Sequence, residues 1–200
     1  MRWLILALTL SAAPALAECP KPGDQLGQGI WITYDGDWMT HTRQSRRGLT
    51  LELTHTDGEN DYFIQSEKVI HIVAEGSWRD GAPVRSETRK YVLADGEEFP
   101  EATPGMRWEG ALVMTEADGK TTKAKSVVNA ADEMSELTIG DCTYPALQLH
   151  LVWEGEGEPG RTTALTLLPD LGVVVLTASG NVGGAYNDFF TATAISRKAP

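Results

Sequence analysis

The chain has 200 residues and a formal net charge of −11 at pH 7, because 28 acidic side chains outnumber 17 lysines and arginines. An acidic surface repels phosphate backbones and anionic lipid head groups, so this composition argues against a nucleic-acid-binding protein. The short basic cluster of Arg43, Arg46 and Arg47 does not change that balance and is expected to be a solvated loop.

Residues 1–17 have the pattern of a secretory signal peptide. Arg2 gives a positive start, residues 3–10 form a short apolar core, and Ala15–Ala17 is a small-residue cleavage site. The apolar core is shorter than the roughly 20 residues needed to span a bilayer. We therefore expect export and cleavage after Ala17.

The mature protein is expected to be one soluble periplasmic domain of residues 18–200. Cleavage removes one arginine and no acidic residue, which changes the net charge from −11 to −12. Glu18 precedes Cys19, whereas a lipid-modified cysteine follows a small residue, so we expect no membrane anchor.

Only two cysteines are present, and an oxidising compartment favours one disulfide, Cys19–Cys142. A redox or metal-binding thiol pair is the alternative, but neither cysteine lies in a motif for it.

Short β-branched and aromatic runs separated by turn residues predict strands along the mature chain. In chain order the predicted strands are residues 30–34, 38–43, 49–54, 62–65, 69–74, 84–94, 107–115, 121–128, 147–153, 162–168, 173–176 and 189–195. Residues 97–105 are expected to be irregular, and residues 129–137 are the only segment considered for a helix. The clearest alternation and the longest apolar runs of the mature chain lie in residues 140–178.

Five Asp-Gly dipeptides separate these runs, and Asp-Gly is a favoured hairpin turn. No amphipathic helices lie between the strands, which excludes βαβ units. The sequence therefore predicts an all-β antiparallel meander with little helix, folded as a half-closed barrel or as a two-layer sandwich.

No sequence motif identifies a catalytic, cofactor or metal site, because HExxH, GxSxG, CxxC, GxGxxG and P-loop patterns are absent. We therefore predict no catalytic residue, cofactor or metal.

His41 and His55 lie in neighbouring predicted strands where they could converge, although polar-face positions tolerate histidine without function. His71 lies in an apolar run and is predicted to be a hydrogen-bonded core histidine rather than a catalytic one. The acidic residues within 154–158 lack the ligand spacing of a calcium loop.

Five tryptophans lie in the mature chain, and their positions in strands favour core packing. If the sheet is half-closed, Trp31, Trp108 and Trp153 are instead expected to face its concave side and form an apolar pocket. The sequence supports both alternatives.

The segment from Cys142 to Val175 resembles the closing strands of small periplasmic β-proteins of Gram-negative bacteria. It contains a Cys-x-Tyr motif, an alternating strand that ends in Trp153, a short hairpin and the run Leu168-Pro-Asp-Leu-Gly-Val-Val-Val. More distantly similar are the LolA/LolB-type lipoprotein carriers, in which such a turn joins two central strands of a half-barrel. This chain lacks the lid helices of those carriers, and the resemblance carries over no functional residue.

From these observations we expect a non-enzymatic periplasmic binding or carrier module with an apolar small molecule as its ligand. One alternative is an interaction domain of an envelope protein complex that engages partners through a sheet edge. The other is an enzyme of unrecognised type that uses His71 or the region of His41 and His55.

Overall fold

A computed structural model describes residues 18–36, 38–45, 47–56 and 61–200. The predicted signal peptide, Arg46 of the basic cluster and the predicted turn at residues 57–58 lie outside the described residues.

The described chain is almost entirely β-structure, which confirms the all-β prediction. Its fourteen strands are β1 (Ile30–Tyr34), β2 (Met39–Gln44), β3 (Thr50–His55), β4 (Asp61–Glu67), β5 (His71–Arg79), β6 (Ala82–Leu93), β7 (Arg107–Thr115), β8 (Thr121–Ala130), β9 (Ser135–Ile139), β10 (Cys142–Gly155), β11 (Arg161–Leu168), β12 (Val173–Asn181), β13 (Tyr186–Phe189) and β14 (Ala192–Ser196). A short 3-10 turn, η1 (Asp24–Leu26), precedes β1.

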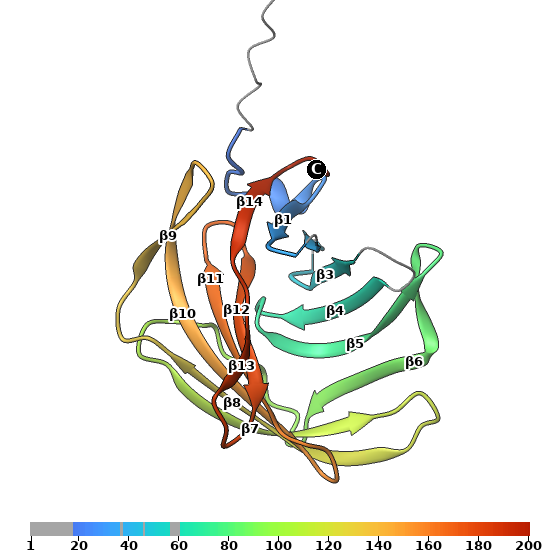
Figure 1. Cartoon of the computed structure of the whole chain (residues 1–200). Coiled ribbons are helices and arrows are strands. Elements are labelled where there is room, and N and C mark those ends of the chain that lie inside the picture. Colours follow the sequence, from blue (N-terminus) through green and yellow to red (C-terminus); the bar gives the residue numbers. More distant parts are fainter. Residues whose placement is uncertain (1–17, 37, 46, 57–60) are drawn as a thin grey trace, which may run out of the picture.

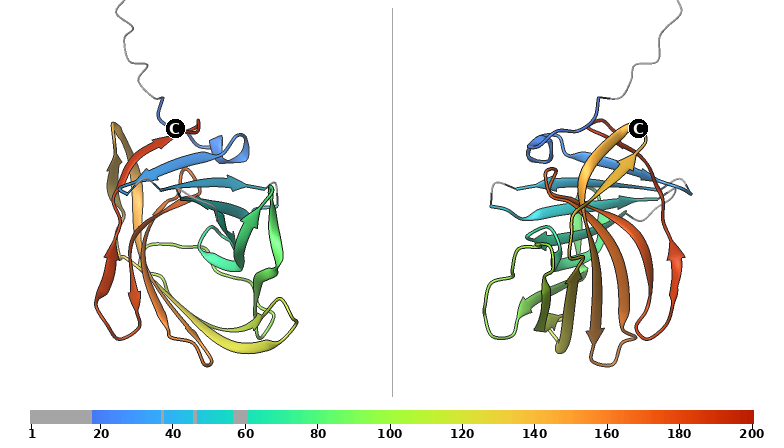
Figure 2. Two further views of the ribbon diagram at one scale, coloured as in Figure 1. Left: turned by 45° about the vertical axis from the view of Figure 1, so that its right-hand side comes forward. Right: turned by 90° about the vertical axis from the view of Figure 1, so that its left-hand side faces the viewer.

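All of these strands belong to one antiparallel sheet with the order β13-β12-β11-β10-β8-β7-β6-β5-β4-β3-β2-β1-β14. Strands that follow one another in the chain are neighbours along most of this path, so the predicted meander is confirmed. The strand β9 lies off the path and pairs only with the first residues of β10, Cys142 to Ala146. The sheet is strongly curved, so that β3, β4 and β5 lie opposite β10, β11 and β12 (Figures 1 and 2).

The last two strands connect the two edges of the curved sheet. β13 pairs with β12 at one edge and β14 pairs with β1 at the other, with only Phe190 and Thr191 between them. The N–H of Phe190 donates to the carbonyl oxygen of Thr177, and the N–H of Asp35 donates to that of Thr191, both at 3.0 Å. The single strand predicted at residues 189–195 is therefore two strands. The sheet is half-closed, because a crossing of the chain, and not a continuous ladder, joins its edges.

The largest apolar core lies where these edges meet. Ile30, Ile32 and Tyr34 of β1 and Ile195 of β14 are buried there against side chains of β9 to β12. The backbone N–H of Leu176 in β12 donates to the hydroxyl oxygen of Tyr34 at 3.1 Å. Apolar burial of this kind stabilises a sheet at about 25 cal/mol per Å², so this core holds the edges together without a ladder.

The predicted disulfide is present between Cys19 and Cys142, and it attaches the N-terminal segment to the start of β10. The hydroxyl of Tyr144 donates to the carbonyl oxygen of Pro20 at 3.3 Å beside it. Glu18 pairs with Arg197 at 2.6 Å, so both ends of the described chain are held at the same end of the sheet.

The helix considered for residues 129–137 is absent, and that prediction was wrong. The segment completes β8 at Ala130 and enters β9 at Ser135. Its few apolar positions form no helical stripe, whereas the end of β8 gains ladder bonds to both β7 and β10.

The strand predicted from Val69 begins two residues later, at His71. Lys68 and Val69 have positive φ values of 49° and 72° and form the turn between β4 and β5. A β-branched residue rarely adopts this conformation, so the sequence favoured a strand there.

We expect Cys142→Ser to lower the free energy of unfolding by about 2–5 kcal/mol, because the bond joins residues 123 positions apart and restricts the unfolded chain. Denaturant titration of the oxidised protein measures this change. The double variant Cys19→Ser/Cys142→Ser is the control, and it should cost no more than the single variant, since each removes the same bond. Two free thiols in peptide maps of the non-reduced native protein would contradict the assignment.

Candidate functional site

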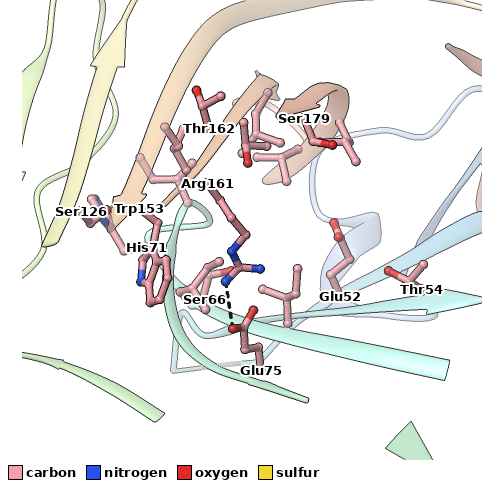
Figure 3. A pocket seen from close by; sticks show the side chains of 18 of the residues that line it. Glu52, Thr54, Ser66, His71, Glu75, Ser126, Trp153, Arg161, Thr162 and Ser179 are labelled. Atoms are coloured by element: carbon pink, nitrogen blue, oxygen red, sulfur yellow. Dashed lines mark hydrogen bonds and ion pairs between the residues drawn. The ribbon is translucent and has the colours of Figure 1, made fainter. Parts of the chain in front are cut away.

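The concave side of the curved sheet contains a cavity of about 610 Å³. Side chains from β2 to β8 and from β10 to β13 line it, so nearly every strand contributes (Figure 3). Cavities that bind small molecules have volumes of about 300–1,000 Å³. The exposed lining residues mark the mouth of the cavity; they are Tyr62 of β4, Arg161 of β11, Asn181 of β12, and Asn187 and Asp188 of β13.

One wall of the cavity is polar and is formed by the inward faces of β2 and β3. Thr42 of β2 lies directly opposite Glu52 of β3, and Thr40 lies opposite Thr54. Thr50 precedes Glu52 by two residues and therefore points to the same side of the sheet. Directly opposed cross-strand residues have Cβ atoms about 4.5–5.5 Å apart, so this wall presents one carboxyl group among closely spaced hydroxyls.

Three hydroxyls of this polar wall are buried without a partner. Thr40, Thr42 and Thr50 are 3 %, 1 % and 2 % exposed, and their Oγ1 atoms form no hydrogen bond within the part of the chain that the structure describes. A buried hydroxyl without a hydrogen bond costs about 1–3 kcal/mol. Three such groups on one cavity wall are therefore unfavourable unless something else supplies their hydrogen bonds.

Glu52 lies among these hydroxyls, and no cation among the described residues lies within ion-pair distance of its carboxylate. Burial raises the pKa of the Glu52 carboxyl to about 7, and the adjacent Thr42 hydroxyl only partly opposes that rise. Figure 3 shows the Glu52 side chain next to Thr54 and on the other side of the cavity from Trp153. The group is thus close to half-ionised at neutral pH.

The second carboxylate of the cavity, Glu75, is paired. Its side chain is 4 % exposed; the Tyr91 hydroxyl donates to its Oε1 at 2.5 Å, and Arg161 Nη2 lies 3.3 Å from the same atom (Figure 3). The Arg161 guanidinium also lies 5.0 Å from the centre of the Trp153 ring. Burial, and then the Glu75 charge, raise the pKa of Tyr91, which keeps its hydroxyl protonated.

The remaining walls are mostly apolar. Phe99, from the irregular segment between β6 and β7, packs with Leu112 of β7, and Trp153 of β10 lies against the same cluster. Leu151 and Leu165 extend this surface along β10 and β11. The cavity therefore has an apolar side and a polar side.

His71 is a buried, hydrogen-bonded histidine, as the sequence predicts, and it also lines the cavity. Its Nε2 donates to the carbonyl oxygen of Pro100 at 3.0 Å, and its ring stacks on Phe99 with centroids 4.5 Å apart. Burial lowers the pKa of His71 to about 4, so its ring is neutral at pH 7.

The structure does not bring the three predicted pocket tryptophans together. Trp153 lines the cavity, whereas Trp108 packs against His71 and Phe99, and Trp31 lies outside the lining. Trp38, which was not predicted, lines the cavity and stacks on Tyr34.

His41 and His55 converge on Trp31, at centroid distances of 4.1 and 5.3 Å. The Nε2 atom of His41 donates to the carbonyl oxygen of Gln28 at 2.8 Å, and His55 Nδ1 lies 3.1 Å from Asp61. Among the described residues, no group of three or more His, Cys, Asp or Glu side chains is arranged to hold a metal ion.

Sequence reasoning missed the polar wall. The signal was the alternation of Thr50, Glu52 and Thr54 with leucines, next to Thr40 and Thr42 in the preceding strand. Alternation places these residues on one face, but only the curvature of the sheet shows that the threonine face is the enclosed one.

Comparison of the chain with protein-family models, with curated proteins and with solved structures finds no match. The described residues contain no helix with the length and apolar character needed to cross a membrane. The function therefore has to be inferred from the geometry of the cavity itself.

We expect Glu52→Gln to stabilise the protein increasingly as the pH rises from about 5 to 8. The folded state keeps the Glu52 proton up to a pKa of about 7, whereas an unfolded chain releases it near 4.5. Between these values the folded state binds more protons, so the free energy of unfolding of the unmodified protein falls with rising pH. The variant lacks this loss and should gain up to about 3 kcal/mol relative to the parent at pH 8.

Denaturant midpoints of parent and variant across this pH range measure the difference, in which the contributions of other titrating groups cancel. Glu136→Gln, at an exposed position of β9, is the matched control and should give a flat difference. A flat difference for Glu52→Gln as well would show that the Glu52 carboxyl is not desolvated.

Proposed function

We propose that this protein is a non-enzymatic binding or carrier module that holds an amphipathic small molecule on the concave side of its sheet. The observation that supports this most strongly is the cavity of about 610 Å³ with one apolar and one polar wall. A compact structural domain fills its interior with side chains to a density near 0.75, so a cavity of this size is more typical of a binding site.

We also propose that the module works in the periplasm after removal of residues 1–17. The Cys19–Cys142 disulfide fits an oxidising compartment outside the cytoplasm, which supports this location. The resemblance of residues 142–175 to small periplasmic β-proteins and, distantly, to lipoprotein carriers points the same way and motivates the use of acyl-chain probes.

We expect a single-chain alkyl probe to bind with a saturable change in tryptophan fluorescence. Trp153 lines the cavity, so entry of an apolar chain replaces water beside its ring and shifts its emission to the blue or quenches it. The response should be reduced in Trp153→Phe, which keeps an aromatic ring, and the remainder should come from Trp38, which also lines the cavity. It should persist in Trp78→Phe, the matched control, because Trp78 packs on Phe63 away from the lining.

Titrations with alkyl chains of 8 to 16 carbons, followed in parallel by calorimetry, test the proposal. An absence of binding by both methods across the series would overturn it. The interaction-domain alternative would then be tested by crosslinking in the periplasm, and the enzyme alternative by the effect of His71→Ala on turnover.

The location proposal predicts that protein recovered from the envelope fraction begins at Glu18. Intact-mass measurement of the oxidised protein should give the mass of residues 18–200 less two hydrogens for the disulfide. Substitution of Ala15 and Ala17 by bulky residues should block processing, since the cleavage site requires small side chains. Recovery of unprocessed protein from the cytoplasm alone would contradict the prediction.

A further inference from the structure

We propose that Glu52 and the hydroxyls of Thr40, Thr42 and Thr50 form a subsite for a primary ammonium group, so that the ligand is an alkylamine or a molecule with an equivalent cationic head. This inference rests on the proposed function, because it specifies the chemistry of the ligand that the cavity holds. It assigns the polar wall to the head group and the apolar wall to the chain.

The balance of charges in the cavity favours a cation. The lining contains three carboxylates, Glu52, Glu75 and Asp188, and one guanidinium, that of Arg161. Arg161 pairs with Glu75, and His71 is neutral at pH 7, so neither neutralises Glu52. The whole chain carries a net charge of −11, which attracts cations toward the mouth and repels anions.

The hydroxyls favour a head group that donates several hydrogen bonds. A primary ammonium group has three N–H donors. The Oγ1 atoms of Thr40, Thr42 and Thr50 are buried acceptors without a partner among the described residues. Thr42 lies directly opposite Glu52 in the ladder, Thr50 is two residues before it, and Thr40 lies opposite Thr54. An ammonium group placed there has donors for the carboxylate and for two of the hydroxyls, which neither a carboxylate nor a quaternary ammonium head can supply.

The arrangement is also difficult to explain as a structural device. Several unpaired buried hydroxyls beside a desolvated carboxyl lower the stability of the empty protein. Unfavourable groups of this kind persist where a ligand compensates them, because binding sites are organised before the ligand arrives. The rigid ladder that joins β2 to β3 holds these side chains in register without the ligand.

The test compares four probes with the same ten-carbon chain: decylamine, decanol, decanoate and decyltrimethylammonium. Titrations are performed at pH 8, where Glu52 is mostly ionised and the alkylamine is still protonated. Calorimetry and Trp153 fluorescence measure the dissociation constants below the concentrations at which the probes form micelles. We expect decylamine to bind at least about tenfold more tightly than each of the other probes, since a charge-assisted hydrogen bond is worth roughly one decade or more in affinity.

Three variants locate the head group. Glu52→Gln keeps the shape of the side chain and should abolish the preference for decylamine over decanol. Glu136→Gln removes an exposed charge from β9 and should leave the preference unchanged, which controls for the net charge of the protein. Glu75→Gln distinguishes the two cavity carboxylates. It leaves the Arg161 guanidinium without its partner and so should reduce the preference, but less than Glu52→Gln, in which the head group loses its own carboxylate.

The outcomes separate this inference from the function on which it rests. Equal binding of all four probes, tighter binding of decanoate, or loss of the preference in Glu75→Gln but not in Glu52→Gln would overturn the ammonium subsite and leave the binding module standing. Binding of decyltrimethylammonium as tight as that of decylamine would overturn the role of the threonine hydroxyls. Absence of binding by every probe and chain length would overturn both.

Discussion

The structure depends on one constraint: a long curved sheet has two edges, and exposed edges invite pairing with other chains. Here the two edge strands, β13 and β14, follow one another in the chain, and the crossing at Phe190 ties the two edges of the sheet together. The apolar core around Ile32 and Ile195 then fixes the crossing in place. The two edges are held together by side-chain packing and not by a continuous hydrogen-bonded ladder. The sheet therefore does not have to close into a small barrel whose interior is filled by side chains. The interior can therefore hold a cavity.

In this half-closed sheet, part of the enclosed face is polar and part of the outer face is apolar. In an ordinary sandwich the enclosed face is apolar throughout, but here the enclosed faces of β2 and β3 carry threonines and Glu52, while Leu51 and Leu53 are partly exposed on the other side. The cost of enclosing polar groups is offset by the cores at the closure and around Leu147 and Phe99. The apolar cores and the polar wall thus occupy different parts of one sheet.

The fold was largely predictable from the sequence because strand formation is a local property. Alternation in residues 147–153 and the Asp-Gly turns place most strands correctly, and two cysteines allow only one intramolecular disulfide. The crossing at Phe190 was not predictable, because nothing local distinguishes a continuous strand from one that changes edge. The polar wall was missed for a related reason: which side of β3 is enclosed depends on the curvature of the whole sheet. Trp31 was expected on the concave side but shares the other face of the sheet with its cross-strand partner His41, because alternation does not tell which face of β1 is enclosed.

Because β14 pairs with β1, the sheet cannot be completed until β14 is available. Trp31 and Ser196 are partners in this ladder although nearly the whole domain lies between them in the chain. A polypeptide that is synthesised N-terminus first therefore exposes the free edge of β1 until residues 192–196 arrive. Contacts between such distant residues form slowly, so β1 is the segment most open to intermolecular pairing before the chain is complete. Protection by a chaperone would be needed most during this interval, and at this strand.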